Sequence, residues 1–434
     1  MSQINNNKIG PISLMPGVGK INALSIFPVA MLNNSVFAFM NFMQPYVLEQ
    51  HLGIARNIQG AVTGSVATMQ EIMILLLTAV MGALADKVGR RPVFAIGLVL
   101  MALAYFCFPL MTNFYEIYFV RAIFAVGVSA ASTVLLIYTG DYPQEQSRGR
   151  LIGIMGLFQG IGVTVTSLVL VKMPSVFTER GFDPIESGTY TLWIGTLICL
   201  LAAIIVFIFL KPGLHQKQQN TSSFKKLFTE GLQAARSDAD IRLAYFASLA
   251  ARGDLIVVGL FTFLWTQNYA LDNNMSIQEG YARGAMIVPI IASTVLVTAP
   301  IFGFIIDRIG RMYGIMIAFF LASLGYTAMG FIDNPMSNSV IPVAILLGMG
   351  EGAAIISSTA MIGKRAPTAI RGTVFGAFAM CGAVGQVIAG GVGGFLFDYI
   401  YTGPYLLMGF LNFTVLLLAI YTWYIRKKTE VDNG

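Results

Sequence analysis

Charged side chains inside apolar stretches are the residues of this sequence that could carry chemistry. Five of them are present: Glu71, Arg121, Arg252, Asp254 and Glu351. A charge at the centre of a bilayer costs at least about 2.5 kcal/mol on insertion scales, so it normally faces a partner charge or a water-filled cavity. A buried carboxyl group beside an arginine can alternate between a protonated state and an ion pair. We therefore expect these residues to bind a proton or an ionic group of a solute.

Spacing along the chain predicts that three of the five charges form one cluster. Asp254 lies 12 residues after Arg242, and Glu351 lies 13 residues before Lys364. At 1.5 Å per residue of helix these separations are about 18 Å and about 20 Å, which places both carboxyl groups near the middle of a membrane. Arg252 is two positions before Asp254, about 200° around a helix, so the two side chains do not face each other. The predicted cluster is Arg252, Asp254 and Glu351.

Glu71 and Arg121 predict a second cluster, in the outer half of the membrane. Asn33 and Asn34 lie in the first half of the chain at the depth that Asp254 occupies in the second half, and we expect them to share the binding site. A structural salt bridge between helices is the alternative role for both clusters, and the sequence leaves it open.

The chemical hypothesis assigns a separate task to each type of charge. Glu351 or Asp254 carries a coupled proton, and Arg252 binds an anionic group of the solute. This arrangement couples a solute to a proton without a histidine, since His51 and His215 both lie in polar connectors.

Twelve apolar stretches are long enough to hold these residues within a membrane. A bilayer core about 30 Å thick requires roughly 20 apolar residues per helix. Backbone groups in lipid must be satisfied within their own segment, so runs of this length are helices. The stretches are 22–46, 59–84, 93–112, 116–139, 150–172, 189–211, 242–268, 283–306, 312–332, 338–362, 372–397 and 402–425.

Composition excludes a water-soluble enzyme and a nucleic-acid-binding protein. Of the 434 residues, 56% are hydrophobic and 11% are charged, and the mean hydropathy is +0.73. Soluble domains carry about a quarter charged residues. Lys and Arg concentrate in the tails and in every second connector, so the net charge of +6 reflects membrane topology with both termini inside. No nucleophile–base or metal-ligand spacing is present, and we expect no enzyme activity, no cofactor and no metal.

A polar interval in the middle of the chain divides the twelve stretches into six and six. Within it, Ser223–Arg236 predicts an amphipathic helix that lies at the membrane interface. The predicted organisation is a cytoplasmic N-terminal tail at 1–21, a first six-helix bundle at 22–211, a cytoplasmic linker at 212–241, a second bundle at 242–425 and a cytoplasmic tail at 426–434.

One short pattern occurs in both halves. The connector after the second stretch contains Gly82, Asp86, Gly89, Arg90 and Arg91. With six helices in each half the two halves have the same orientation, and in such parallel repeats the substrate site lies between the halves near the midplane. Gly82 is expected to allow a close approach of helices. The second copy follows the eighth stretch, shifted by 221 positions, and consists of Gly303, Asp307, Arg308, Gly310 and Arg311.

With this loop in both halves, the chain resembles the major facilitator superfamily. The resemblance implies an all-α integral membrane protein of twelve transmembrane helices in two six-helix parallel-repeat bundles that work by alternating access. It implies that Asp86 and the basic residues beside it brace the inward gate. Arg121 and Gly127 resemble the family's arginine–glycine motif on the fourth helix, which is tied to proton transfer. Ala125 stands where the family usually has the glycine.

These observations predict a proton-coupled secondary active transporter of a small polar solute, anionic or zwitterionic, with symport favoured. A proton-driven exporter of drugs, siderophores or metabolites is the alternative within this class. A transporter-like membrane receptor is the alternative from another class. The expected partners are the solute, protons and the lipid bilayer, with no nucleic acid. The chain is expected to be a monomer in a bacterial inner membrane.

Overall fold

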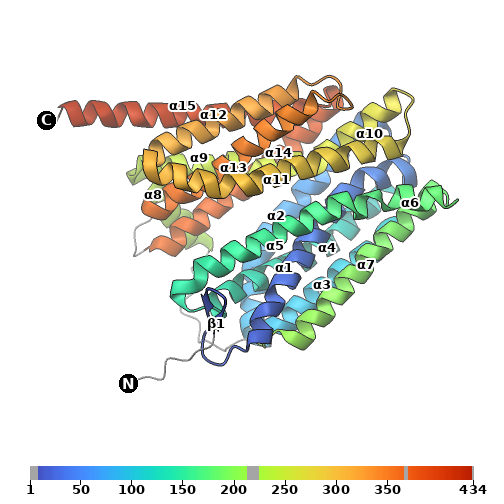
Figure 1. The fold of residues 1–434 in the computed structure, drawn as a ribbon, viewed down its shortest axis with the longest axis horizontal. Coiled ribbons are helices and arrows are strands. Elements are labelled where there is room, and N and C mark those ends of the chain that lie inside the picture. The colour runs from blue at the N-terminus through green and yellow to red at the C-terminus, as the bar shows by residue number, and fades with distance from the viewer. Residues whose placement is uncertain (1–7, 213–223, 366–369, 433–434) are drawn as a thin grey trace. The chain divides into compact units, whose positions relative to one another are not determined.

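Helices make up nearly the whole fold. The computed structural model describes residues 8–212, 224–365 and 370–432 (Figure 1). Within these ranges, twelve helical segments are long and apolar enough to cross a membrane, which confirms the twelve predicted helices. The elements are β1 (Lys8–Ile9), β2 (Ile12–Ser13), α1 (Lys20–Tyr46), η1 (Val47–His51), α2 (Arg56–Val88), α3 (Arg90–Cys107), η2 (Phe108–Leu110), α4 (Phe114–Asp141), η3 (Glu145–Ser147), α5 (Arg148–Leu168), η4 (Leu170–Lys172), α6 (Met173–Glu179), α7 (Pro184–Phe209), α8 (Phe224–Ser237), α9 (Ala239–Ile256), η5 (Val257–Phe261), α10 (Thr262–Asp272), α11 (Ile277–Ile309), α12 (Arg311–Gly330), α13 (Val340–Arg365), α14 (Arg371–Tyr399) and α15 (Gly403–Asp432).

Several helices extend beyond the apolar stretches because polar residues cap them. Helix α11 begins at Ile277, six residues before the predicted stretch 283–306. The Ser276 hydroxyl accepts a hydrogen bond from the Glu279 backbone N–H at 3.3 Å, and the Glu279 carboxylate accepts one from the Ser276 N–H at 2.8 Å. This reciprocal pair satisfies N–H groups that the first turn of a helix leaves free. Apolar length therefore predicts where a helix is, and capping residues determine where it begins.

The chain on either side of Asp254 is helical, with a change of winding just after it. The π-helical segment η5 follows α9 directly. Such insertions are rare and frequently occur at functional sites. Gly253 itself is buried, and a Cβ there would come within 3.0 Å of the Gly385 carbonyl oxygen, so this glycine permits close packing against α14.

Two segments outside the spans are also ordered. The strands β1 and β2 pair in antiparallel fashion, and the chain after them is held by a hydrogen bond from the Met15 N–H to the Tyr142 carbonyl at 2.8 Å. Helix α8 confirms helical structure in the predicted amphipathic segment 223–236, although Ser223 lies outside the described residues and so does His215. Ala234 and Ala235 of α8 are buried in a core cluster with α9 and α14, so this part of α8 packs against protein.

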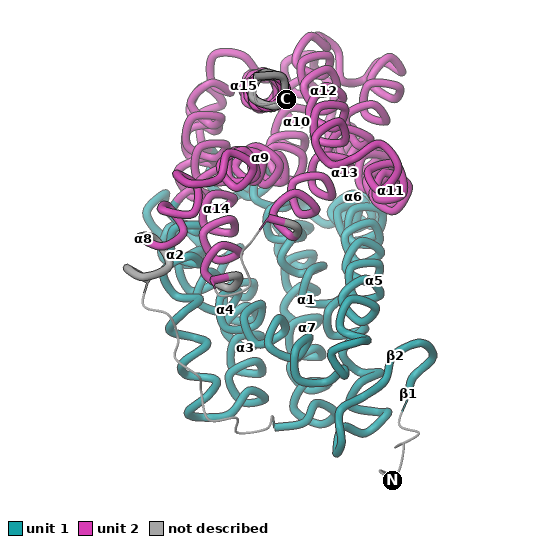
Figure 2. The backbone as a smooth tube through the Cα atoms, turned by 90° about the vertical axis from the view of Figure 1, so that its left-hand side faces the viewer, with its two compact units in different colours: residues 1–53, 69–219 teal, residues 54–68, 220–434 magenta. Residues whose placement is uncertain are grey.

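The described contacts divide the chain into two compact units. Unit 1 comprises residues 1–53 and 69–219, and unit 2 comprises residues 54–68 and 220–434, as the two colours of Figure 2 show. In unit 1, α1 packs against α5 and α7, and α3 packs against α4 and α7. In unit 2, α13 packs against α11 and α12, α12 packs against α15, and α9 packs against α14. The first part of α2 belongs to unit 2 and its remainder to unit 1.

Candidate functional site

Two carboxyl groups meet in the core of unit 2. Asp254 on α9 is 0% exposed and Glu351 on α13 is 4% exposed. The Glu351 carboxylate is the charged group that acts most strongly on Asp254. The Asn412 side-chain amide on α15 donates to Asp254 Oδ1 at 3.3 Å, and the Tyr326 ring on α12 lies beside Glu351. Four helices of unit 2 therefore converge on this acidic pair.

The acidic pair is incompletely hydrogen-bonded. Within the described part of the chain, Asp254 Oδ2, Glu351 Oε2 and Asn412 Oδ1 are buried and have no hydrogen-bond partner. The buried Tyr326 hydroxyl lies beside the Glu351 carboxylate and is positioned to donate to it. A buried polar atom left unpaired costs about 1–3 kcal/mol, and more if it is charged. The carboxylate and amide oxygens of the cluster outnumber its donors, which are the Asn412 amide and the Tyr326 hydroxyl.

Arg252 is separated from the acidic pair. Its side chain is exposed, whereas Asp254 on the same helix is buried. The aliphatic part of the Arg252 side chain lies across Gly382 of α14, where a Cβ would collide with it. Of the predicted cluster of three, the structure thus brings together Asp254 and Glu351 and places Arg252 on another face of α9. The 200° separation between positions 252 and 254 predicted this division.

The predicted pair in unit 1 is present, with an additional partner. Arg121 on α4 is 0% exposed, and its guanidinium donates to Asn41 Oδ1 on α1 at 2.6 Å. Glu71 on α2 is buried and acts electrostatically on Arg121. The Arg121 guanidinium carbon lies 5.7 Å from the centroid of the Phe124 ring. Arg121 Nε and Nη1 are buried with no hydrogen-bond partner among the described residues, although the Glu71 carboxylate lies in the same cluster.

Of the two asparagines predicted at the binding site, only Asn34 forms a side-chain hydrogen bond among the described residues. Asn33 is buried, and its Oδ1 has no hydrogen-bond partner within the described ranges. Asn34 donates to the Gln159 carbonyl oxygen on α5 at 3.4 Å, at the long limit of a hydrogen bond. The sequence had not singled out Asn412 or Tyr326, because uncharged polar residues are too common in helices to stand out by type.

The glycines of the repeated loop do not have the role in close helix packing that the sequence predicted for Gly82. A Cβ at Gly82 would meet only Thr133 Cγ2 at 3.8 Å, and a Cβ at Gly303 would meet nothing within 4 Å, so neither glycine is required for close helix approach. Gly89 and Gly310 instead have φ of +106° and +87°, and they precede α3 and α12. Only glycine adopts this conformation readily, which explains the repeated glycine.

In the first copy of the loop the charges are paired. Arg90 forms an ion pair with Asp141 at the end of α4, and Asp86 acts electrostatically on Arg90. The Arg90 backbone N–H donates to the Pro212 carbonyl at 3.2 Å. The Arg91 guanidinium carbon lies 4.9 Å from the centroid of the Phe207 ring on α7. These contacts join the ends of α3, α4 and α7.

In the second copy the charges are arranged differently. Asp307 and Arg308 are exposed. Arg311 is partly buried, and its Nη1 is buried without a hydrogen-bond partner among the described residues. The second copy therefore keeps the glycine geometry of the first copy but not its ion pair.

In unit 2 the first part of α2 packs against the end of α14, and we call this contact the α2–α14 seam. It consists of Gly60 and Gly64 on α2, which face Gly390 and Gly394 on α14, and of Asp398. A Cβ at Gly64 would approach the Gly390 carbonyl oxygen to 2.1 Å, so the two backbones are in direct contact. The Asp398 carboxylate accepts hydrogen bonds from the Gly60 N–H at 2.7 Å and the Ala61 N–H at 2.8 Å. Small residues on both helices permit this approach.

A second polar contact lies beside the seam. Arg56 pairs with Asp272 at 2.9 Å, and the Tyr401 hydroxyl donates to the other Asp272 oxygen at 2.6 Å. Burial, together with the Asp272 carboxylate, raises the pKa of Tyr401. The hydroxyl therefore stays protonated and continues to donate.

Comparisons with known proteins agree with this architecture. The sequence model of the Major Facilitator Superfamily matches residues 26–390 and 296–434. The chain is 26% identical to the magnetosome protein MamH of Paramagnetospirillum magneticum, over 90% of this chain and 89% of that protein. It is 24% identical to a proline/betaine transporter of Salmonella typhimurium (71% of this chain, 63% of that protein) and 21% identical to the multi-drug resistance efflux pump PmrA of Streptococcus pneumoniae (83% and 86%). The crystal structure of the nucleoside transporter NupG shares the fold, with a TM-score of 0.72 at 16% identity over 92% of this chain and 98% of that one.

Proposed function

Because the chain belongs to the Major Facilitator Superfamily, we propose that it is a proton-coupled secondary transporter of a small polar solute, anionic or zwitterionic. In this proposal the two halves alternate in exposing a central site to the two sides of a bacterial inner membrane. Both termini lie in the cytoplasm, and the chain acts as a monomer. Import by symport is the proposed direction.

The observation that carries proton coupling is the acidic pair of Asp254 and Glu351. Two carboxylates held together away from water repel each other, so the pair is far more stable when it holds a proton. A proton on one carboxyl group also supplies a donor to oxygens that otherwise have no partner. Loss of that proton leaves a second buried negative charge, which favours a different packing of the four helices. Protonation and conformation are thereby linked.

Support for a charged solute comes from the arginines. Arg252 is exposed on the same helix as Asp254, and Arg121 in unit 1 has two N–H nitrogens with no acceptor among the described residues. A guanidinium binds a carboxylate or phosphate through two parallel hydrogen bonds. The similarity to a transporter of proline and betaine, which are zwitterions, agrees with a solute that has an anionic group.

Uptake into proteoliposomes tests this proposal. We would impose an inward proton gradient and measure accumulation of radiolabelled proline, glycine betaine and a panel of organic anions. Glu351→Gln and Asp254→Asn should each abolish gradient-driven accumulation, while exchange of labelled for unlabelled solute persists. Asp333→Asn, at an exposed loop carboxylate of the same unit, is the matched control and should behave as the wild type. Full accumulation in both Glu351→Gln and Asp254→Asn would contradict proton coupling through the acidic pair.

Export is a second candidate, favoured by the similarity to a drug efflux pump. The same carboxyl pair would serve an antiporter, since the proton and the solute would then compete for one conformational state. Reversing the proton gradient in the same vesicles distinguishes the two. An importer accumulates solute when protons flow inward, whereas an antiporter accumulates solute when protons flow outward.

A further inference from the structure

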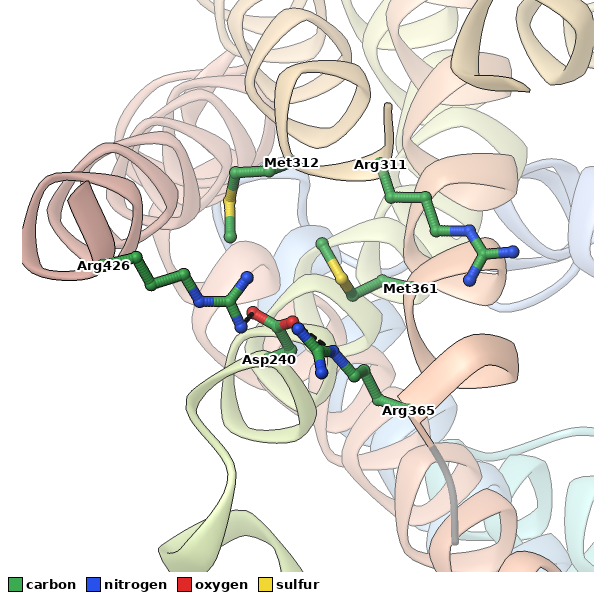
Figure 3. A pocket seen from close by; sticks show the side chains of 6 residues that line it. All are labelled: Asp240, Arg311, Met312, Met361, Arg365 and Arg426. Carbon is green, nitrogen blue, oxygen red and sulfur yellow. Dashed lines mark hydrogen bonds and ion pairs between the residues drawn. The ribbon is translucent and has the colours of Figure 1, made fainter. Parts of the chain in front are cut away.

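A cavity near one end of unit 2 is lined by arginines and is separate from the acidic pair. It has a volume of about 180 Å³ and is formed by Asp240, Arg311, Met312, Met361, Arg365 and Arg426 (Figure 3). Arg365 donates to Asp240 Oδ2 at 2.6 Å, and Arg426 pairs with Asp240 Oδ1. Figure 3 shows Arg311 on the opposite side of the cavity, away from the Asp240 carboxylate. Two guanidinium groups therefore share the Asp240 carboxylate, and Arg311 adds a third positive charge to the lining.

The internal repeat indicates what is missing from this cavity. Arg311 occupies the position in the second half that Arg90 occupies in the first, 221 residues earlier. Arg90 is neutralised by Asp141. The same shift from Asp141 leads to Ile362, and the next residue is Gly363, so the second half has no carboxylate there. The arginine has been kept in both halves, and its acidic partner is present only in the first.

Two further features of the cavity require negative charge. Arg311 Nη1 is buried and has no hydrogen-bond acceptor within the described ranges. A buried charged donor without an acceptor is unfavourable. In addition, α12 begins at Arg311 with no side chain capping its first turn, and free N–H groups at a helix start carry partial positive charge. Arg311 and Met312, the first two residues of α12, both line the cavity.

We propose that this cavity binds a phosphate group, either as free inorganic phosphate or as the phosphomonoester headgroup of an anionic lipid. Three arginines against one aspartate leave a net charge of two, and a phosphomonoester carries about −1.5 to −2 at neutral pH. A water molecule occupies about 30 Å³ of liquid, so the cavity has room for one phosphate group with its four oxygens.

The guanidinium groups suit such a ligand. Each carries five N–H donors in a planar fork that matches phosphate oxygens. The ion pairs with Asp240 use one nitrogen of Arg365 and one of Arg426. The two arginine side chains remain 42% and 37% exposed, so their other N–H donors can reach a ligand. Asp240, with its side chain 2% exposed, holds these two guanidinium groups in place. The bound phosphate would supply the acceptor that Asp141 supplies in the first half.

Thermal unfolding of the full chain in a neutral maltoside detergent tests the site. Inorganic phosphate is titrated against sodium chloride of equal ionic strength, and the same variants are compared in nanodiscs of phosphatidylcholine with and without phosphatidic acid. A ligand that binds the folded state raises the melting temperature in a saturable way. Arg311→Gln should raise the half-maximal phosphate concentration about tenfold or more, the expected loss of a charge-assisted hydrogen bond. Arg242→Gln, at an exposed arginine of α9, is the control and should leave it unchanged.

Each outcome has a defined meaning. Saturable stabilisation by phosphate in detergent that Arg311→Gln removes supports the site, with free phosphate as a sufficient ligand. Stabilisation seen only with phosphatidic acid and lost in Arg311→Gln supports it with the lipid headgroup as the ligand. No stabilisation in either medium, or equal stabilisation in wild type and Arg311→Gln, overturns the proposal. If Arg311→Gln does not fold, Arg311→Lys keeps the charge and loses the planar fork, and undiminished phosphate binding in that variant overturns the proposal equally.

Discussion

Asp398→Asn should loosen the α2–α14 seam by an amount that the structure defines. The carboxylate accepts two backbone N–H groups of α2, from Gly60 at 2.7 Å and from Ala61 at 2.8 Å. Asparagine has one acceptor oxygen, so one of these bonds is lost, and its amide N–H₂ then faces a backbone donor. A hydrogen bond to a charged group contributes about 1.5–3 kcal/mol. Since Asp398 is only partly buried, we take the lower end, about 1.5 kcal/mol, which is roughly a tenfold change in an equilibrium.

Maleimide labelling of a cysteine at position 67 measures this change. Ala67 is 3% exposed and packs in the core of unit 2, so a cysteine there reacts only when the seam opens. Cys107, Cys199 and Cys381 are first replaced by serine or alanine. The labelling rate then follows the open population, and Asp398→Asn should raise it about tenfold. Asp333→Asn should leave the rate unchanged. A rate in Asp398→Asn within twofold of the parent would refute the reasoning, because the two hydrogen bonds would then contribute nothing to closure.

Three further predictions concern the same helices and their ends. Gly64→Ala should reduce the rate of transport, because the added methyl group overpacks the α2–α14 seam at a cost of about 1–3 kcal/mol. Gly153→Ala is the control, since a Cβ there has nothing within 4 Å, and it should transport at the wild-type rate. Equal transport rates in the two variants would contradict the close contact at Gly64. Arg90→Gln should lower the free energy of unfolding in denaturant by about 3 kcal/mol, because it leaves the Asp141 carboxylate without its ion-pair partner. Adding Asp141→Asn to that variant should recover part of the lost stability. Additive losses in the double variant would show that the two side chains are not coupled. Asn41→Ala removes the acceptor of the buried guanidinium on α4 and should cost about 1–3 kcal/mol in the same assay; an unchanged midpoint would exclude that hydrogen bond.

Apolar length was sufficient to predict the twelve helices, because a membrane span is a constraint on length and polarity alone. It was insufficient for helix ends, since α11 begins with the Ser276–Glu279 capping pair, outside the apolar run. It also did not predict the hairpin of β1 and β2, which depends on long-range contacts such as the Met15 N–H to the Tyr142 carbonyl.

Helical periodicity predicted one aspect of the site and missed another. It predicted that Arg252 and Asp254 lie on different faces of their helix, and in the structure Arg252 is exposed and Asp254 is buried. It could not identify Asn412 as a neighbour of Asp254, because the two lie 158 positions apart on different helices. The sequence also predicted that Gly82 allows a close approach of helices, but a Cβ at Gly82 would have room. In this loop it is Gly89 whose positive φ requires glycine, and a φ angle leaves no periodic signal in the sequence.

Both units bury polar atoms of charged side chains that have no hydrogen-bond partner among the described residues, and these unmet requirements bear on the proposed mechanism. In unit 1, Arg121 has two buried nitrogens without acceptors, even though Asn41 accepts from the third. In unit 2, Asp254 and Glu351 have buried oxygens without donors. An anionic group would satisfy the first requirement and a proton the second. The Glu71 carboxylate acts on Arg121 in unit 1 and the Tyr326 hydroxyl lies beside Glu351 in unit 2, so in the proposal a bound anion and a proton add to partners that are already present. Symport requires in addition that the solute anion and the proton each strengthen the binding of the other, which is a coupling free energy between the two sites.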